Sequence, residues 1–127
     1  MNEQLQVKYR HSLIDLTSNI AIYGWMIAPY NEGGLQLKGA ELSVYAVIYA
    51  CSNMRGNLYI YGLSYMADWT HCTKQHIIRC LQSLQNKNYI AKYEKINNNN
   101  VKLYGYKVTK CMDDYEINGY KRIDYIK

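Results

Sequence analysis

The chain has 127 residues, of which 49% are hydrophobic and 20% charged, and its formal net charge is +5. This composition is typical of one globular domain and excludes a wholly disordered chain. No apolar run approaches the roughly 20 residues that a membrane-spanning helix needs. Met1–Arg10 also lacks the apolar stretch of a signal peptide. We therefore expect a cytoplasmic protein with no membrane partner.

The sequence contains four cysteines: Cys51, Cys72, Cys80 and Cys111. They form no CxxC pair and no dense framework, so we expect free thiols. Cys72, His76 and Cys80 have a spacing that can present zinc ligands on one helical face. The predicted helix needs Cys80 in the core, however, and His71 is the only further ligand nearby in the sequence. We therefore predict no metal site and no cofactor.

The first half of the chain contains one well-marked helix. Ile20–Trp25 is short, apolar and rich in β-branched and aromatic residues, which suits either an edge strand or the start of a helix. Asn31–Gly34 reads as a turn. Gly39–Ser52 has apolar residues at helical spacing and on nearly every side, which predicts a helix at the centre of the core. Leu58–Tyr61 is a candidate for a short strand.

Two further helices are predicted close together. Gly62–Trp69 favours a short helix, and Thr70–Thr73 is a polar break in which either threonine can cap the next helix. Lys74–Lys87 favours a longer helix with one apolar face, and Asn88 suits the left-handed conformation that ends helices.

A hairpin follows the second of these helices. Tyr89–Ile96 and Val101–Val108 read as strands, and Asn97–Asn100 reads as the tip between them. The order of short helix, break, longer helix and hairpin predicts an α+β fold of the winged helix-turn-helix type, a three-helix core with a β-hairpin wing and extra terminal elements. We assign residues 1–19 to an N-terminal arm, 20–108 to the winged-helix domain, and 109–127 to a C-terminal arm or hairpin.

The positive charge is concentrated in the same region. Thr70–Lys107 spans 38 residues with seven basic residues and one acidic residue, a net charge of +6, whereas the rest of the chain has a net charge of −1. A concentrated basic face is typical of phosphate binding, although an ordinary solvated surface has equal weight on charge alone.

The candidate DNA contacts follow from this layout, because the exposed first turns of such a helix meet base edges in the major groove. On the helix these residues are Thr73, Lys74, Gln75, His76, Ile78, Arg79 and Gln82. On the hairpin, Lys95 and Lys102 suit phosphates, and Asn98 and Asn99 suit phosphate or the minor groove. Ile78 is open to two interpretations, contact with a thymine methyl group or docking onto a protein.

Four stretches carry a resemblance to a known family: GWM at Gly24–Met26, LKGAEL at Leu37–Leu42, LSYMADWT at Leu63–Thr70 and the run Lys74–Ile90. They resemble the winged helix-turn-helix proteins of Gram-positive bacteria, phages and mobile elements, including the N-terminal domains of replisome organisers and replication initiators. The resemblance implies a winged-helix fold and duplex-DNA binding, with Thr73–Lys87 as the reading helix. It also implies a role in transcription regulation or in replication initiation, with a protein partner of one of those processes.

A second function class stays open, a protein–protein interaction or oligomerisation module with a winged-helix fold that does not read DNA. We find no nucleophile–base–orienter set and expect no enzyme activity. Fifteen tyrosines and no phenylalanine can indicate base stacking on single strands, but a structural role is the favoured interpretation. The turn signal Asn118-Gly119 between Tyr115–Ile117 and Tyr120–Tyr125 predicts a C-terminal hairpin or arm that can support a homodimer.

Overall fold

The computed structural model describes residues 20–52, 58–111 and 116–123. In chain order the elements are α2 (Gly24–Ile27), a 3-10 turn (Tyr30–Glu32), α3 (Gly39–Ser52), α4 (Gly62–Thr70), α5 (Lys74–Asn86), β1 (Ile90–Ile96), β2 (Lys102–Val108), a second 3-10 turn (Thr109–Cys111), β3 (Glu116–Ile117) and β4 (Tyr120–Arg122). The α+β prediction is confirmed, and the three predicted helices and two hairpin strands agree with the structure to within one residue at each end. Within the described ranges, no helix has the length and hydropathy that crossing a bilayer requires.

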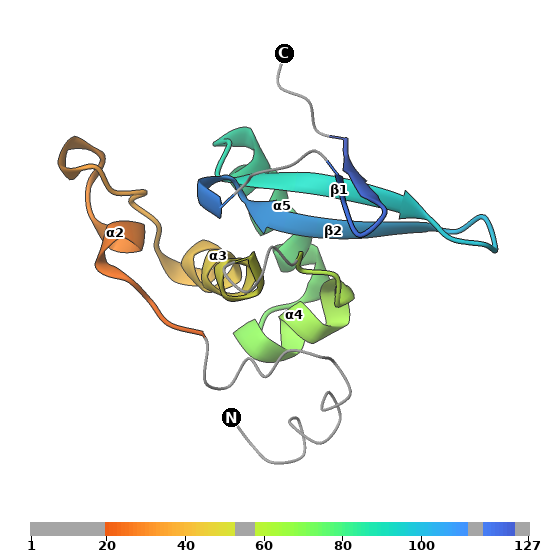
Figure 1. Cartoon of the computed structure of the whole chain (residues 1–127). Coiled ribbons are helices and arrows are strands. Elements are labelled where there is room, and N and C mark those ends of the chain that lie inside the picture. The colour runs from red at the N-terminus through yellow and green to blue at the C-terminus, as the bar shows by residue number, and fades with distance from the viewer. Residues whose placement is uncertain (1–19, 53–57, 112–115, 124–127) are drawn as a thin grey trace.

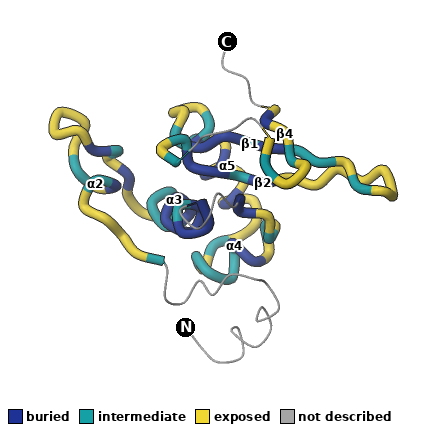
Figure 2. Tube along the Cα trace, in the orientation of Figure 1, coloured by how far each residue is buried: buried dark blue, intermediate teal, exposed yellow. Residues whose placement is uncertain are grey.

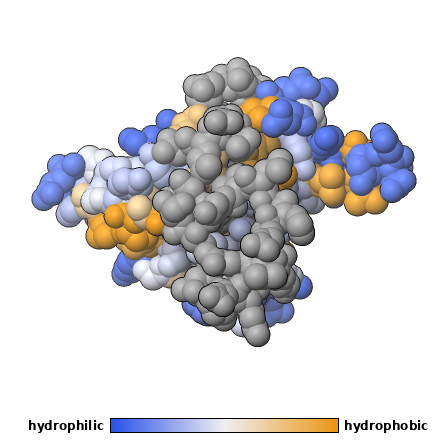
Figure 3. Space-filling view, turned by 60° about the horizontal axis from the view of Figure 1, so that its bottom comes forward, coloured by the Kyte–Doolittle hydropathy of each residue, from blue (hydrophilic) through white to orange (hydrophobic). Residues whose placement is uncertain are grey.

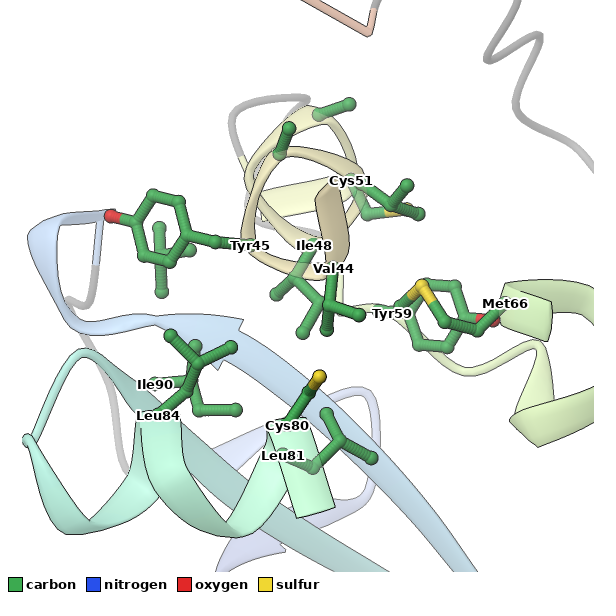
Figure 4. Packing of buried hydrophobic residues seen from close by; sticks show 14 of the residues in the cluster. Val44, Tyr45, Ile48, Cys51, Tyr59, Met66, Cys80, Leu81, Leu84 and Ile90 are labelled. Atoms are coloured by element: carbon green, nitrogen blue, oxygen red, sulfur yellow. The ribbon is translucent and has the colours of Figure 1, made fainter. Parts of the chain in front are cut away.

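Helix α3 lies at the centre of the molecule, as its nearly all-round apolar sequence predicts. Eight of its 14 residues are buried. It packs against α4, α5 and β2, and Figure 2 shows it as the most continuously buried helix. In the core, Val44 and Ile48 of α3 face Leu84 of α5 and Ile90 of β1 (Figure 4). Ser52 joins the end of α3 to β2, because its Oγ accepts a hydrogen bond of 3.0 Å from the N–H of Val108.

A tight turn joins α4 to α5. His71 ends α4 in the left-handed conformation, with φ of 59°, and the next N–H, that of Cys72, donates to the carbonyl of Ala67 at 3.3 Å. Thr73 then caps α5, and its Oγ1 accepts a hydrogen bond of 3.1 Å from the N–H of His76. Of the two threonines proposed as caps, Thr73 is therefore the one used.

We expect Thr73→Ala to lower the free energy of unfolding by about 1 kcal/mol, because the substitution leaves one N–H of the first turn of α5 without its acceptor. Thr73→Ser keeps the hydroxyl and is expected to stay close to wild type. Urea unfolding curves of the three proteins measure the difference. Equal midpoints for wild type and Thr73→Ala would show that the cap contributes nothing.

The sheet has four antiparallel strands in the order β2-β1-β4-β3. The β1–β2 hairpin pairs from Ile90↔Val108 out to Ile96↔Lys102. It extends beyond the helices, while α5 lies behind it and α4 below it in the view of Figure 1. At the tip, the Asn97 side-chain oxygen accepts hydrogen bonds from two backbone N–H groups further along the loop, which orders the asparagine-rich turn.

Leu58–Tyr61 does not form the predicted strand. The stretch makes a single bridge, Tyr59↔Tyr106, because the chain turns at Gly62, with φ of 82°, into α4. Ile20–Trp25 likewise forms no edge strand. Of the two alternatives, the start of a helix is confirmed, because α2 begins at Gly24. Beyond α2, the N–H of Leu37 donates to the carbonyl of Met26 at 2.9 Å, which brings the segment back to the core.

The predicted C-terminal hairpin is present in the described residues. Asn118 and Gly119 form its turn with φ of 52° and 86°. Its second strand, β4, pairs with β1 through Tyr93↔Arg122 and Glu94↔Lys121, so the hairpin extends the same sheet. The predicted arm at 1–19, together with residues 112–115 and 124–127, lies outside the described residues.

Candidate nucleic-acid interface

Helix α5 presents one face to the core and the opposite face to solvent. Ile77, Cys80, Leu81 and Leu84 are buried. All seven residues predicted on the opposite face are exposed, namely Thr73, Lys74, Gln75, His76, Ile78, Arg79 and Gln82. The sequence period of 3.6 residues therefore assigns the two faces correctly.

Polar contacts on one flank fix the rotation of α5 against α3. The Glu41 carboxylate accepts a hydrogen bond of 2.7 Å from the Ser83 hydroxyl and one of 2.9 Å from the Lys87 ammonium. Beyond the helix, the Tyr89 hydroxyl donates to the Leu35 carbonyl at 3.1 Å. These contacts stabilise the orientation in which the opposite face of α5 points to solvent.

The two flanks of α5 have different surroundings. His76 and Arg79 line a shallow cleft of about 490 Å³ with Lys38, the residue that precedes α3. Ile78 and Gln82 line a groove on the other flank, shared with the β1–β2 hairpin. Sequence reasoning missed Lys38, because nothing in the local pattern places the residues before α3 next to α5.

The hairpin residues are divided between two sheet faces. Lys102 lines the groove with α5, and its ammonium lies 3.9 Å from the Glu94 carboxylate. Lys95 lies on the opposite face of the sheet from Lys102, because it belongs to the next pair in the register. Its ammonium lies 5.6 Å from the centre of the Tyr120 ring. The structure therefore brings Lys102, but not Lys95, beside α5.

The tip residues Asn98 and Asn99 are exposed. Lys92 also lines the groove and was not among the predicted contacts. Side chains alternate along a strand, so Lys92 lies on the same face of β1 as the residue that pairs with Lys102. Once the register is known, this alternation predicts that Lys92 lies on the groove side of the sheet.

The surface charge of the basic segment is smaller than its sequence count. Lys107 is only 1% exposed, because it pairs with Ala91 on the sheet face where Leu58, Ala91 and Tyr93 form a second small core. Lys87 is engaged by Glu41. Lys74 and Arg79 are exposed and form no ion pair with any residue in the described ranges, so they carry the accessible positive charge of α5.

Most of the tyrosines that the structure describes pack in or against the hydrophobic cores. Four are almost fully buried, namely Tyr45, Tyr59, Tyr65 and Tyr93. Tyr45 packs edge-on against Trp25 and stacks with Tyr49, and burial raises its pKa. Tyr104, on the outer half of β2, is 42% exposed.

None of the four cysteines, all of which fall in the described ranges, forms a disulfide bond. Burial raises the pKa of the Cys51 thiol to about 12. Within residues 20–52, 58–111 and 116–123, no three His, Cys, Asp or Glu side chains gather as a metal site would require.

We expect Cys51 to resist iodoacetamide at pH 8 in the folded protein, because its side chain is fully buried and alkylation requires the thiolate. Cys72 is partly exposed and serves as the internal reference for labelling. Mass spectrometry of tryptic peptides gives the modified fraction at each position. Labelling of Cys51 at the rate of Cys72 would contradict the buried position, and labelling in urea is the control for chemical competence.

Comparisons of the chain with protein-family models, with curated proteins and with solved structures find no match. A functional proposal therefore rests on the residues and their geometry. These are an exposed helix face with two accessible basic residues, a hairpin beside it, and one tip that carries exposed asparagines.

Proposed function

We propose that this chain is a winged helix-turn-helix domain that binds double-stranded DNA, with α5 in the major groove and the β1–β2 hairpin as the wing. Its biological role would be transcription regulation or replication initiation in a phage or mobile element, as the resemblance of its sequence motifs implies. No chemistry is required of the site, because binding itself is the activity.

The observation that carries the proposal is the exposed N-terminal half of α5. Lys74, Gln75 and Arg79 point away from the core on a helix whose rotation is held by Glu41. Lysine and arginine donate to guanine or phosphate, and glutamine pairs with adenine in the major groove. A helix with these side chains and no covering element in the described residues supports a reading role.

The hairpin supports the same proposal. It extends past the helices beside α5, with Lys102 on the α5 side and exposed Asn98 and Asn99 at its tip (Figure 1). A duplex that receives α5 in its major groove would bring its backbone towards this hairpin. Lys95, on the other sheet face, would contact that backbone only from the side of the C-terminal hairpin.

Fluorescence anisotropy with a labelled random-sequence duplex and the matching single strand tests the proposal. We expect the duplex to bind more tightly, because α5 has the dimensions of a major-groove helix and most of the tyrosines in the described ranges pack in or against the cores rather than being available for stacking. Tighter binding of the single strand would contradict it. Binding of neither, with self-association in light scattering, would favour the oligomerisation module.

A further inference from the structure

A groove of about 520 Å³ runs between α5 and the β1–β2 hairpin. Helix α5 contributes Ile78, Gln82 and Gln85 to one wall. The hairpin contributes Lys92, Lys102 and Tyr104 to the other. The volume falls within the range of about 300–1,000 Å³ that is usual for small-molecule sites.

The apolar character of this groove is unusual for a surface that only meets phosphates. Four of its large apolar or aromatic side chains are exposed: Ile60 by 46%, Ile78 by 41%, Leu103 by 36% and Tyr104 by 42%. Figure 3 shows apolar side chains on the hairpin next to its hydrophilic tip. Exposed apolar side chains around one groove mark interaction sites, because their burial against a ligand is favourable.

The charged residues of the groove indicate which kind of ligand it would bind. Its two charged lining residues, Lys92 and Lys102, are both basic, and no lining residue is acidic. The Lys92 ammonium lies 4.3 Å from the centre of the Tyr104 ring, so a cation and an aromatic face adjoin inside the groove. A flat apolar ligand can pack on Ile78 and Tyr104, and its negative group can pair with Lys92, because the Lys102 ammonium already lies 3.9 Å from the Glu94 carboxylate.

We propose that the groove binds a small aromatic anion and that a ligand bound there excludes duplex DNA from α5. The first part depends only on the groove. The second part rests on the proposed function, because Ile78, Gln82 and Lys102 are at once groove residues and predicted DNA contacts. The domain would then be a DNA-binding protein released by a small aromatic acid.

The probe for the first part is 8-anilinonaphthalene-1-sulfonate, an aromatic sulfonate whose fluorescence rises in apolar surroundings. We expect one saturable site on the folded protein, and a melting temperature that rises with probe concentration, because the probe binds the native state. N-phenyl-1-naphthylamine, which lacks the sulfonate, is expected to bind about tenfold more weakly. Equal affinity for the two probes, or a fluorescence rise with no gain in melting temperature, would overturn the site.

A matched pair of variants locates the probe. Lys92→Met removes the charge and keeps the apolar stem, and we expect it to weaken sulfonate binding by about tenfold. Lys121→Met makes the same change on β4, outside the groove, and is expected to bind like wild type. Unchanged affinity in Lys92→Met, or an equal loss in both variants, would place the probe elsewhere.

Competition between the sulfonate probe and the duplex tests whether a ligand in the groove excludes DNA from α5. We expect the sulfonate to displace a labelled duplex from wild type at concentrations near its own dissociation constant, and sodium sulfate at the same concentration to displace little. Simultaneous binding of probe and duplex would overturn the exclusion and leave the groove intact. If the duplex does not bind even without probe, the proposed function and the exclusion fall together, whereas the fluorescence titration still decides the groove.

Discussion

Replacing Lys74 and Arg79 together by alanine is expected to weaken duplex binding by about a hundredfold, with about tenfold from each residue. Both side chains are exposed on the outer face of α5, and neither is engaged in an ion pair within the described ranges. Their substitution therefore removes contacts to DNA without removing contacts in the fold. Anisotropy titrations of the two single variants and the double variant measure the loss.

The control for this pair is Lys121→Ala, which removes an exposed lysine of β4 that is neither on α5 nor among the residues lining the groove beside it. We expect its affinity to equal that of wild type, and all four variants to melt at the wild-type temperature. If Lys74→Ala and Arg79→Ala bind as tightly as Lys121→Ala, the assignment of α5 as the reading helix is wrong.

Leu84→Ala is expected to lower the free energy of unfolding by about 3 kcal/mol, and the melting temperature by roughly 10 °C. Leu84 is fully buried and faces α3 across the centre of the core (Figure 4). Truncation leaves a cavity between the two helices that the surrounding side chains fill only in part. Thermal unfolding followed by circular dichroism measures the shift.

Gln82→Ala, two residues earlier on the solvent side of the same helix, is the matched control for stability. We expect its free energy of unfolding to stay within about 0.5 kcal/mol of wild type, because the side chain leaves no core cavity. A similar cost for Leu84→Ala and Gln82→Ala would contradict the assignment of the two faces of α5.

The helices and the hairpin could be predicted from the sequence, because each has a strong local signal. Gly39–Ser52 is apolar on nearly all sides, and the structure buries most of it. Lys74–Asn86 has one apolar stripe, and Asn88 adopts the left-handed conformation expected at its end, with φ of 64°. The prediction of a strand at Leu58–Tyr61 was wrong, because a short apolar run does not indicate where the chain turns.

The candidate site could be predicted only on α5, where the helical period fixes which side chains face solvent. On the hairpin, the face that a lysine occupies depends on the register and on which face α5 covers, so Lys95 and Lys92 could not be sorted. Lys107 counted as surface charge in the sequence, yet a second small core buries it. Lys38 reaches the site by tertiary packing alone.

The salt dependence of duplex binding tests the central claim most directly. Wild-type affinity for a duplex is measured at about 50 and 200 mM salt, where roughly four phosphate contacts predict a loss of about a hundredfold. The Lys74→Ala and Arg79→Ala variants are expected to give shallower slopes, since each releases fewer counterions. Absence of binding at the lower salt concentration, or an affinity that is the same at both, would contradict the proposal that this chain binds DNA through α5.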